Sequence, residues 1–265
     1  MVNLSSDGMG ILDHIEELRA RFIKIIVSIA ILSIFTFIFS IKEFSYGNFI
    51  LYLPFPDIYD NISAQFIERM KADLLPNYVQ LIVTNPTQAI FAQITTSLFL
   101  GIVLSMPIIV YQIEKYLSPA LYPNEKRMIS RILIPATILF SLGCIFSYFL
   151  ITPFTLDFLY GYALPLGAQT FLTIDEFISF VFLFTLSFGL SFQLPIIMIV
   201  LTSIGLIEPE FWKKNFSYAV VAIVIFGAII TPDGSGITMW FVVIPMMFLY
   251  ILGYLFVHRK VKVEP

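Results

Sequence analysis

The chain has 265 residues, of which 58% are hydrophobic and 12% are charged, and it contains 28 phenylalanines. Soluble domains carry about 25% charged residues and are only about half apolar, so this composition excludes an ordinary soluble protein and predicts a membrane protein. The formal net charge of −3 gives no reason to expect a nucleic-acid partner. The single cysteine, Cys144, excludes a disulfide within the chain.

Apolar residues gather in six segments, and a helix crosses a bilayer with about 20 such residues. We therefore expect an all-α integral membrane protein with one six-span domain over residues 1–265, folded as a concave bundle of kinked helices. The expected spans are approximately 22–41, 89–112, 129–152, 177–206, 216–231 and 237–257. Prolines inside four of them predict the kinks: Pro107, Pro135, Pro195 and Pro245.

The fifth span is short, because only 17 residues separate Lys214 from Pro232. As a helix they reach about 26 Å, which is less than the hydrocarbon core of about 30 Å. We therefore expect the membrane to be thin beside the fifth and sixth spans.

Basic residues predict the orientation of the chain. If both termini are cytoplasmic, 12 of the 15 Lys and Arg residues lie on the cytoplasmic side, and Lys42, Arg69 and Lys71 lie on the other. This bias follows the positive-inside rule. It predicts a multi-pass protein of the cytoplasmic membrane, in contact with its lipids, with both termini in the cytoplasm.

The longest loop between spans, 43–88, is predicted to lie outside. It contains apolar residues at helical spacing, which predict an amphipathic helix on the membrane surface or over the spans: Ile62, Phe66, Ile67, Met70 and Leu74.

Catalytic and cofactor-binding patterns are absent from the sequence. The two histidines, His14 and His258, lie at opposite ends of the chain, and the sequence has no Cys cluster and no nucleophile elbow. We therefore expect no enzyme, metal or cofactor. The interiors of the spans also lack Asp, Glu and His, which weakens the alternative of a small-solute secondary transporter without removing it.

Charged residues at the cytoplasmic face are the remaining candidates for function. Glu16 and Glu17 precede the first span beside Arg19 and Arg21, and Glu125 lies in the loop after the second. Carboxylates gain nothing from the positive-inside rule, and near apolar surface they lose hydration unless a cation pairs with them. Because guanidinium and carboxylate groups pair in a bidentate manner, we expect Glu17 and Glu125 to bind a ligand that carries arginines.

Gln193 is the most polar candidate within the spans, two residues before Pro195. A buried amide in a membrane seeks a hydrogen bond, worth about 0.6 to 2 kcal/mol. Two readings stay open: a bond within the chain, or a docking point for a separate membrane helix at Gln193 and Pro195.

Five elements of the sequence resemble the TatC family, the core subunit of the twin-arginine protein translocase. They are "HIEELRAR" (14–21), "MPIIVYQIEKYLSPALYPNEKR" (106–127), "GCIFSYFLITP" (143–153), "FGLSFQLP" (188–195), and "TPD" with "IPM" (231–233 and 244–246). The likeness runs from His14 to about Gly253, and the elements occur in the family's order and on the expected sides of the spans.

The resemblance implies a receptor for the twin-arginine signal peptides of folded cargo, which recruits single-span TatA/TatB-type partners and other copies of itself and is driven by the proton-motive force. It places signal-peptide binding at Glu17 and Glu125. Arg19 and Arg21 would position Glu17 and anchor the first span, and Tyr116 stands where the family commonly has Phe. It also implies roles for Pro54 and Asp233 in the outer loops.

The sequence departs from the family pattern in span four and in span six. Gln193 stands where Glu is common, so a role that needs a charge there is in doubt. In span six, Ile251 replaces a frequent Glu, so a polar contact expected there is absent.

Overall fold

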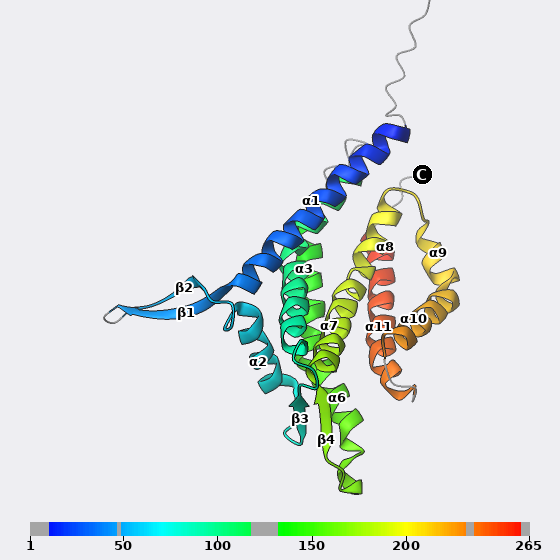
Figure 1. The fold of residues 1–265 in the computed structure, drawn as a ribbon. Helices are drawn as coiled ribbons and strands as arrows, with labels where there is room; N and C mark the ends of the chain where they lie inside the picture. The colour runs from blue at the N-terminus through cyan, green and yellow to red at the C-terminus, as the bar shows by residue number, and fades with distance from the viewer. Residues whose placement is uncertain (1–10, 47–48, 118–131, 232–235, 261–265) are drawn as a thin grey trace, which may run out of the picture.

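The computed structural model describes residues 11–46, 49–117, 132–231 and 236–260, most of which are helical (Figure 1). The first half of these elements comprises α1 (Ile11–Ile38), β1 (Phe39–Tyr46), β2 (Phe49–Pro56), α2 (Ile62–Leu74), β3 (Val79–Ile82) and α3 (Gln88–Leu117). The second half comprises α5 (Leu133–Phe146), a π-helical segment (Ser147–Ile151), α6 (Thr152–Gly161), a 3₁₀ turn (Leu164–Leu166), β4 (Thr170–Thr173), α7 (Ile174–Ser191), α8 (Leu194–Ser203), α9 (Pro209–Lys214), α10 (Phe216–Ile230) and α11 (Ile237–Lys260).

Five helical stretches are long and apolar enough to cross a membrane, within the part of the chain that the structure describes. They are Ile15–Ile38, Gln88–Tyr116, Leu133–Leu166, Ile174–Ser203 and Ile237–Arg259. α10 is also apolar but has 15 residues, or about 22 Å of helix. The protein is thus a mostly helical, multi-pass membrane protein. Its sixth crossing stays a prediction, as do the single domain and the concave, kinked shape.

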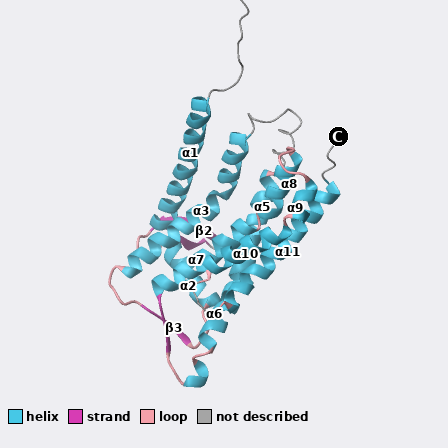
Figure 2. Cartoon of the chain, turned by 90° about the vertical axis from the view of Figure 1, so that its right-hand side faces the viewer, coloured by secondary structure: helices cyan, strands magenta, loops and turns pink. Residues whose placement is uncertain are grey.

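Both ends of the described chain lie at the same end of the molecule. The first turn of α1 and the last turn of α11 share this end in two views that differ by 90° (Figures 1 and 2). α9 lies toward it as well, whereas α6, β3 and β4 lie toward the opposite end. A chain that crosses a membrane an even number of times has both ends on the same side, and this placement agrees with that requirement.

The expectation of an all-α fold is wrong in one respect, because the structure contains two small sheets. β1 and β2 form an antiparallel hairpin in which Phe39 pairs with Pro56 and Tyr46 with Phe49. β3 and β4 pair in parallel, from Val79 opposite Thr170. Two strand-length runs rich in aromatic and β-branched residues flank Gly47-Asn48 in the sequence. This pattern is typical of hairpins, but an assignment of spans from segment length and hydropathy does not detect it.

An ion pair at the base of the hairpin joins β1 to the residue that follows β2. Lys42 Nζ donates to Asp57 Oδ2 at 2.8 Å and lies 5.4 Å from the centre of the Phe55 ring. This hydrogen bond lowers the pKa of the Asp57 carboxyl and raises the pKa of the Lys42 ammonium. Both groups are therefore charged at neutral pH, and acidification through the lowered pKa of Asp57 removes the pair.

The amphipathic helix expected in the outer loop is confirmed as α2. Asn61 caps its N-terminus by accepting from Ala64 N at 2.9 Å, and the Asn61 amide donates to Gln93 Oε1 of α3 at 2.9 Å. Ser63 Oγ lies 2.5 Å from Ser97 Oγ of α3 and donates to Thr36 O of α1 at 3.2 Å. These buried polar contacts join α1, α2 and α3.

Three predicted spans have different bounds in the structure. α1 begins at Ile11 and ends at Ile38, where the hairpin starts, instead of covering 22–41. The third helical stretch continues to Gly161 through the π segment before Pro153, because proline removes a backbone donor and shifts the hydrogen-bond register. The fourth is interrupted between α7 and α8, before the buried Pro195.

α7 is the central helix of the described structure. It begins with the predicted capping box of Thr173 and Glu176. Its Phe177 packs in an apolar cluster with α2, α3 and α6, and its Phe184 and Phe188 pack in a second cluster with α8, α10 and α11. All three rings are fully buried, so α7 is the helix against which both halves pack.

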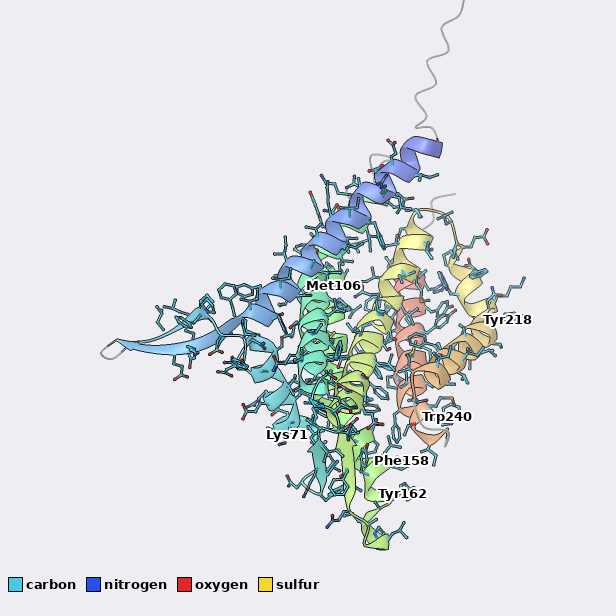
Figure 3. All side chains as sticks on the ribbon, viewed as in Figure 1. Lys71, Met106, Phe158, Tyr162, Tyr218 and Trp240 are labelled. Atoms are coloured by element: carbon cyan, nitrogen blue, oxygen red, sulfur yellow. The ribbon has the colours of Figure 1, made fainter. Side chains whose placement is uncertain are left out.

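Aromatic side chains gather at the end of the molecule away from α9. Figure 3 places Phe158, Tyr162 and Trp240 toward that end. Phe158 of α6 packs edge-on against Phe241 of α11, with ring centres 5.5 Å apart. Aromatic residues at this level are typical of a membrane–water interface.

α1 lies along α3 and depends on one close backbone approach. A Cβ at Gly101 of α3 would collide with Ser33 Oγ and would lie 2.9 Å from the carbonyl oxygen of Ile29, both on α1. Small residues at such points allow membrane helices to pack closely. Gly101 therefore sets the separation of the two helices.

We predict that Gly101→Val pushes α1 away from α3 and lowers the free energy of unfolding by about 1–3 kcal/mol. Thermal unfolding in detergent measures the effect. Leu104→Val, at an exposed position of the same helix, is the matched control. Equal melting temperatures for the two variants would show that the α1–α3 contact adapts to a side chain at position 101.

Candidate functional site

Glu17 lies on the first turns of α1 in an ion pair with Arg21, one helical turn later. Arg21 Nε and Nη2 both donate to Glu17 Oε1, at 3.0 and 2.5 Å, and each side chain is 19% exposed. Residues four apart face one another on a helix surface. The pair is thus partly shielded from water, where a charged hydrogen bond is stronger than at the open surface.

Arg21 also reaches across to α3. Its Nη1 donates to Gln112 Oε1 at 3.4 Å, a contact between residues 91 positions apart. Gln112 belongs to the "YQ" pair of the sequence pattern, but it was not among the candidate residues, because a span-end glutamine carries no charge to draw attention to it. The start of α1 and the end of α3 therefore form one polar cluster of Glu17, Arg21 and Gln112.

Arg19, which was expected to position Glu17 together with Arg21, is exposed and takes no part in the ion pairs found among the described residues. Of the two arginines, Arg21 holds the carboxylate, because a spacing of four residues brings two side chains together on a helix and a spacing of two does not. Any role of Arg19 in binding stays a prediction.

Tyr116 lies one turn after Gln112 on α3 and is half-buried. The spacing of four residues places the two on one face of the helix. Glu125 lies outside the described residues, so its distance to Glu17 stays a prediction.

The cluster pairs one carboxylate with one guanidinium group. Arg21 uses one oxygen of Glu17, and the other oxygen accepts no hydrogen bond from the described residues. A second guanidinium can therefore bind the same carboxylate while Arg21 keeps its place.

Gln193 donates from its amide nitrogen to the carbonyl oxygen of Ala136 on α5, at 3.0 Å. This is the bond within the chain that was one of the two readings. Pro195 of α8 is buried. Pro195 and Met198 both lie directly against Gly253 of α11. The structure thus places both residues between helices of the chain, and docking of a separate helix stays a prediction.

The two outer-loop candidates differ in what the structure says of them. Pro54 is exposed on β2, opposite Ile41 of β1. Its place in a two-stranded hairpin fits proline, which cannot donate to a second neighbouring strand. Asp233 lies outside the described residues.

The long apolar helices, with a polar cluster of Glu17, Arg21 and Gln112 at one end, define a multi-pass membrane protein whose polar chemistry is at the membrane surface. The family description "Sec-independent protein translocase protein (TatC)" matches residues 13–245. The chain belongs to the TatC family.

Relatives and solved structures agree with this assignment. TatC of Cenarchaeum symbiosum is 42% identical over 95% of this chain and 95% of its own length. TatC of Aquifex aeolicus is 34% identical over 97% and 99%, and that of Escherichia coli K12 is 28% identical over 94% and 88%. A crystal structure of the twin-arginine translocase receptor TatC superposes with a TM-score of 0.74 at 33% identity, covering 91% of this chain and 96% of that one. The chain is thus a protein-translocase component, and the small-solute transporter alternative is not supported.

We predict that Gln193→Leu removes the bond to Ala136 and lowers the free energy of unfolding by about 0.6–2 kcal/mol. Thermal unfolding in detergent is the measurement. Ser141→Ala, which removes an exposed hydroxyl bonded to its own helix, is the control. If Gln193→Leu unfolds no earlier than this control but crosslinks less to a single-span partner, Gln193 acts in docking and not in holding α5 and α8 together.

Proposed function

We propose that this protein is the twin-arginine signal-peptide receptor and core component of a translocase that exports folded proteins, driven by the proton-motive force. Single-span TatA/TatB-type proteins and other copies of the chain are its proposed partners. In this proposal the protein lies in the cytoplasmic membrane, has no catalytic activity of its own, and has six spans with α10 as the short fifth. The shared end of the two described termini and the basic residues at that end support cytoplasmic termini.

The observation that carries the receptor proposal is the Glu17–Arg21 pair. A carboxylate already held by one guanidinium, and partly shielded from water, offers its second oxygen to another. In the proposed complex the peptide's arginine pair binds Glu17 and Glu125. Tyr116 packs beside the arginines on the α3 face next to Gln112, and Arg19 contributes at the exposed rim.

Arginine fits this site better than lysine for a geometric reason. A guanidinium has five donors in a planar fork and remains weakly hydrated, whereas an ammonium group is a compact and strongly hydrated charge. With Arg21 on one oxygen of Glu17, an incoming guanidinium can donate to the other oxygen and to a neighbouring acceptor at once. A lysine in its place makes fewer simultaneous bonds.

The first prediction for this site concerns peptide specificity. A peptide with its Arg-Arg pair intact should bind the purified protein in nanodiscs more tightly than the same peptide with Lys-Lys. Glu17→Gln or Glu125→Ala should weaken binding roughly ten- to hundredfold, because each removes a charged hydrogen bond worth about 1.5–3 kcal/mol. Glu16→Gln, at an exposed neighbouring carboxylate, should change binding little. Equal binding of both peptides would leave only general charge attraction.

The second prediction concerns Arg21 as a positioning residue. Arg21→Gln should weaken binding of the Arg-Arg peptide by about three- to tenfold, the loss expected for one hydrogen bond that orients Glu17. Arg21→Lys should recover part of the affinity. Lys24→Gln, an exposed position on the same helix with the same loss of charge, is the control. Tighter binding in Arg21→Gln would mean that Arg21 competes with the peptide instead of supporting Glu17.

A further inference from the structure

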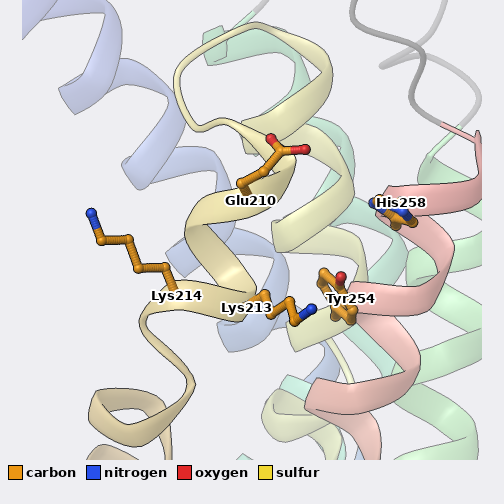
Figure 4. A pocket seen from close by; sticks show the side chains of 5 residues that line it. All are labelled: Glu210, Lys213, Lys214, Tyr254 and His258. Carbon is orange, nitrogen blue, oxygen red and sulfur yellow. The ribbon is translucent and has the colours of Figure 1, made fainter.

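A second polar site lies between α9 and the last turns of α11, apart from the Glu17 cluster. It is a pocket of about 460 Å³ lined by Glu210, Lys213, Lys214, Tyr254 and His258 (Figure 4). Figure 4 shows Lys213 directed toward Tyr254, with His258 on the same side of α11 one turn further on. Neither the sequence motifs nor the proposed peptide site uses any of these residues.

The pocket carries an excess of positive charge. Two ammonium groups and an imidazole line it with one carboxylate. The ion pairs found in the described ranges are Glu17–Arg21, Lys42–Asp57 and Arg69–Asp73, so Lys213 and Lys214 form no ion pair with the described residues. Lys213, Lys214 and His258 are all exposed, and a ligand can therefore reach them.

The walls of the pocket are held in place by hydrogen bonds beside it. Trp212 Nε1 of α9 donates to Thr202 Oγ1 of α8 at 2.9 Å, and Tyr250 Oη of α11 donates to the carbonyl oxygen of Trp212 at 2.8 Å. The rings of Tyr254 and His258 stack, with centres 5.8 Å apart. A site whose walls are already fixed loses little conformational entropy when a ligand binds.

The surroundings indicate a lipid and not a free anion. Phe211 on α9 and Leu255 on α11 are exposed apolar residues on the two helices that form the pocket. α11 is one of the apolar helices long enough to cross the membrane, and the pocket lies at its end. Basic pockets between membrane helices at the cytoplasmic surface are typical binding sites for anionic lipid headgroups.

We propose that this pocket binds the headgroup of an anionic phospholipid whose phosphate is esterified to a hydroxyl-bearing group such as glycerol. Lys213 and His258 donate to the phosphate oxygens, and Lys214 adds positive charge at the rim. The Tyr254 hydroxyl donates to the same group, and the Glu210 carboxylate accepts from a headgroup hydroxyl. The acyl chains lie along the exposed apolar residues of α9 and α11.

Such a lipid would fix α9 at the membrane surface. α9 leads directly into α10, which reaches only about 22 Å. A headgroup held between α9 and α11 therefore ties the short α10 to the depth of the long α11. This role does not depend on peptide binding.

The experiment uses Trp212 as a reporter, because it lies beside the pocket. The chain has two tryptophans, so Trp240→Phe leaves Trp212 alone. We expect phosphatidylglycerol, titrated into the full chain in detergent, to change Trp212 emission saturably, and phosphatidylcholine to change it little. Lys213→Gln with Lys214→Gln should weaken binding by about fivefold for each lysine.

The matched control removes two lysines at the same end of the molecule, from the start of α1 and the end of α3, by Lys24→Gln with Lys115→Gln. Equal weakening in both double variants would overturn the pocket in favour of general surface attraction. Glycerol phosphate that saturates the signal as well as the lipid does would overturn the lipid in favour of a free anion. Circular dichroism and melting temperature confirm that each variant is folded. A Glu210→Gln variant provides a second measurement. It should bind phosphatidic acid as tightly as the unchanged protein does and phosphatidylglycerol more weakly.

Discussion

The burial of α7 along its length, in one apolar cluster near its start and in a second further on, is the constraint on which the rest of the structure depends. Phe177 packs toward α2, α3 and α6, while Phe184 and Phe188 pack toward α8, α10 and α11. Lipid tails are as apolar as these side chains, so close packing and not hydrophobicity holds such helices together. Gly189 shows how close the packing is, since a Cβ there would lie 2.6 Å from the ring of Phe140 on α5. Just beyond the end of α7, the hydrogen bond from Gln193 to the carbonyl oxygen of Ala136 links the chain to α5 a second time.

α1 stands in contrast to α7, because few of its residues are fully buried in the described structure. Only 6% of its most apolar window is buried, and its main neighbour is α3. The close approach at Gly101 and the polar contacts of Thr36, Ser63 and Ser97 hold its far half. Near its start, Arg21 and Gln112 link it to α3. The carboxylate of Glu17 is therefore oriented by contacts that cross from one helix to the other.

The end of the molecule that carries both described termini combines two polar regions. The region at α1 and α3 presents a carboxylate, which suits a guanidinium ligand. The pocket at α9 and α11 presents ammonium groups and an imidazole, which suit a phosphate. The Trp212 contacts to α8 and α11 connect the second region to the cluster that α7 completes. The positive-inside rule explains basic residues only as determinants of orientation. At α9 and α11 some of these basic residues also line a pocket.

The sequence by itself determined the membrane class, the approximate positions of the apolar helices, the capping box of α7 and the helix at 62–74. These depend on hydropathy, on spacing along one helix and on local hydrogen bonds, all of which neighbouring residues carry. The tertiary structure decided that the loop before α2 is a hairpin, since strand pairing joins residues that single-segment patterns do not connect. It also decided which of the two expected arginines holds Glu17, namely Arg21, and that Arg21 reaches Gln112. It decided further that Gln193 bonds to α5, and that Lys213 and His258 share a pocket. The contacts of Arg21 with Gln112 and of Gln193 with Ala136, and the pocket shared by Lys213 and His258, bring together residues of different helices, which depends on how those helices pack.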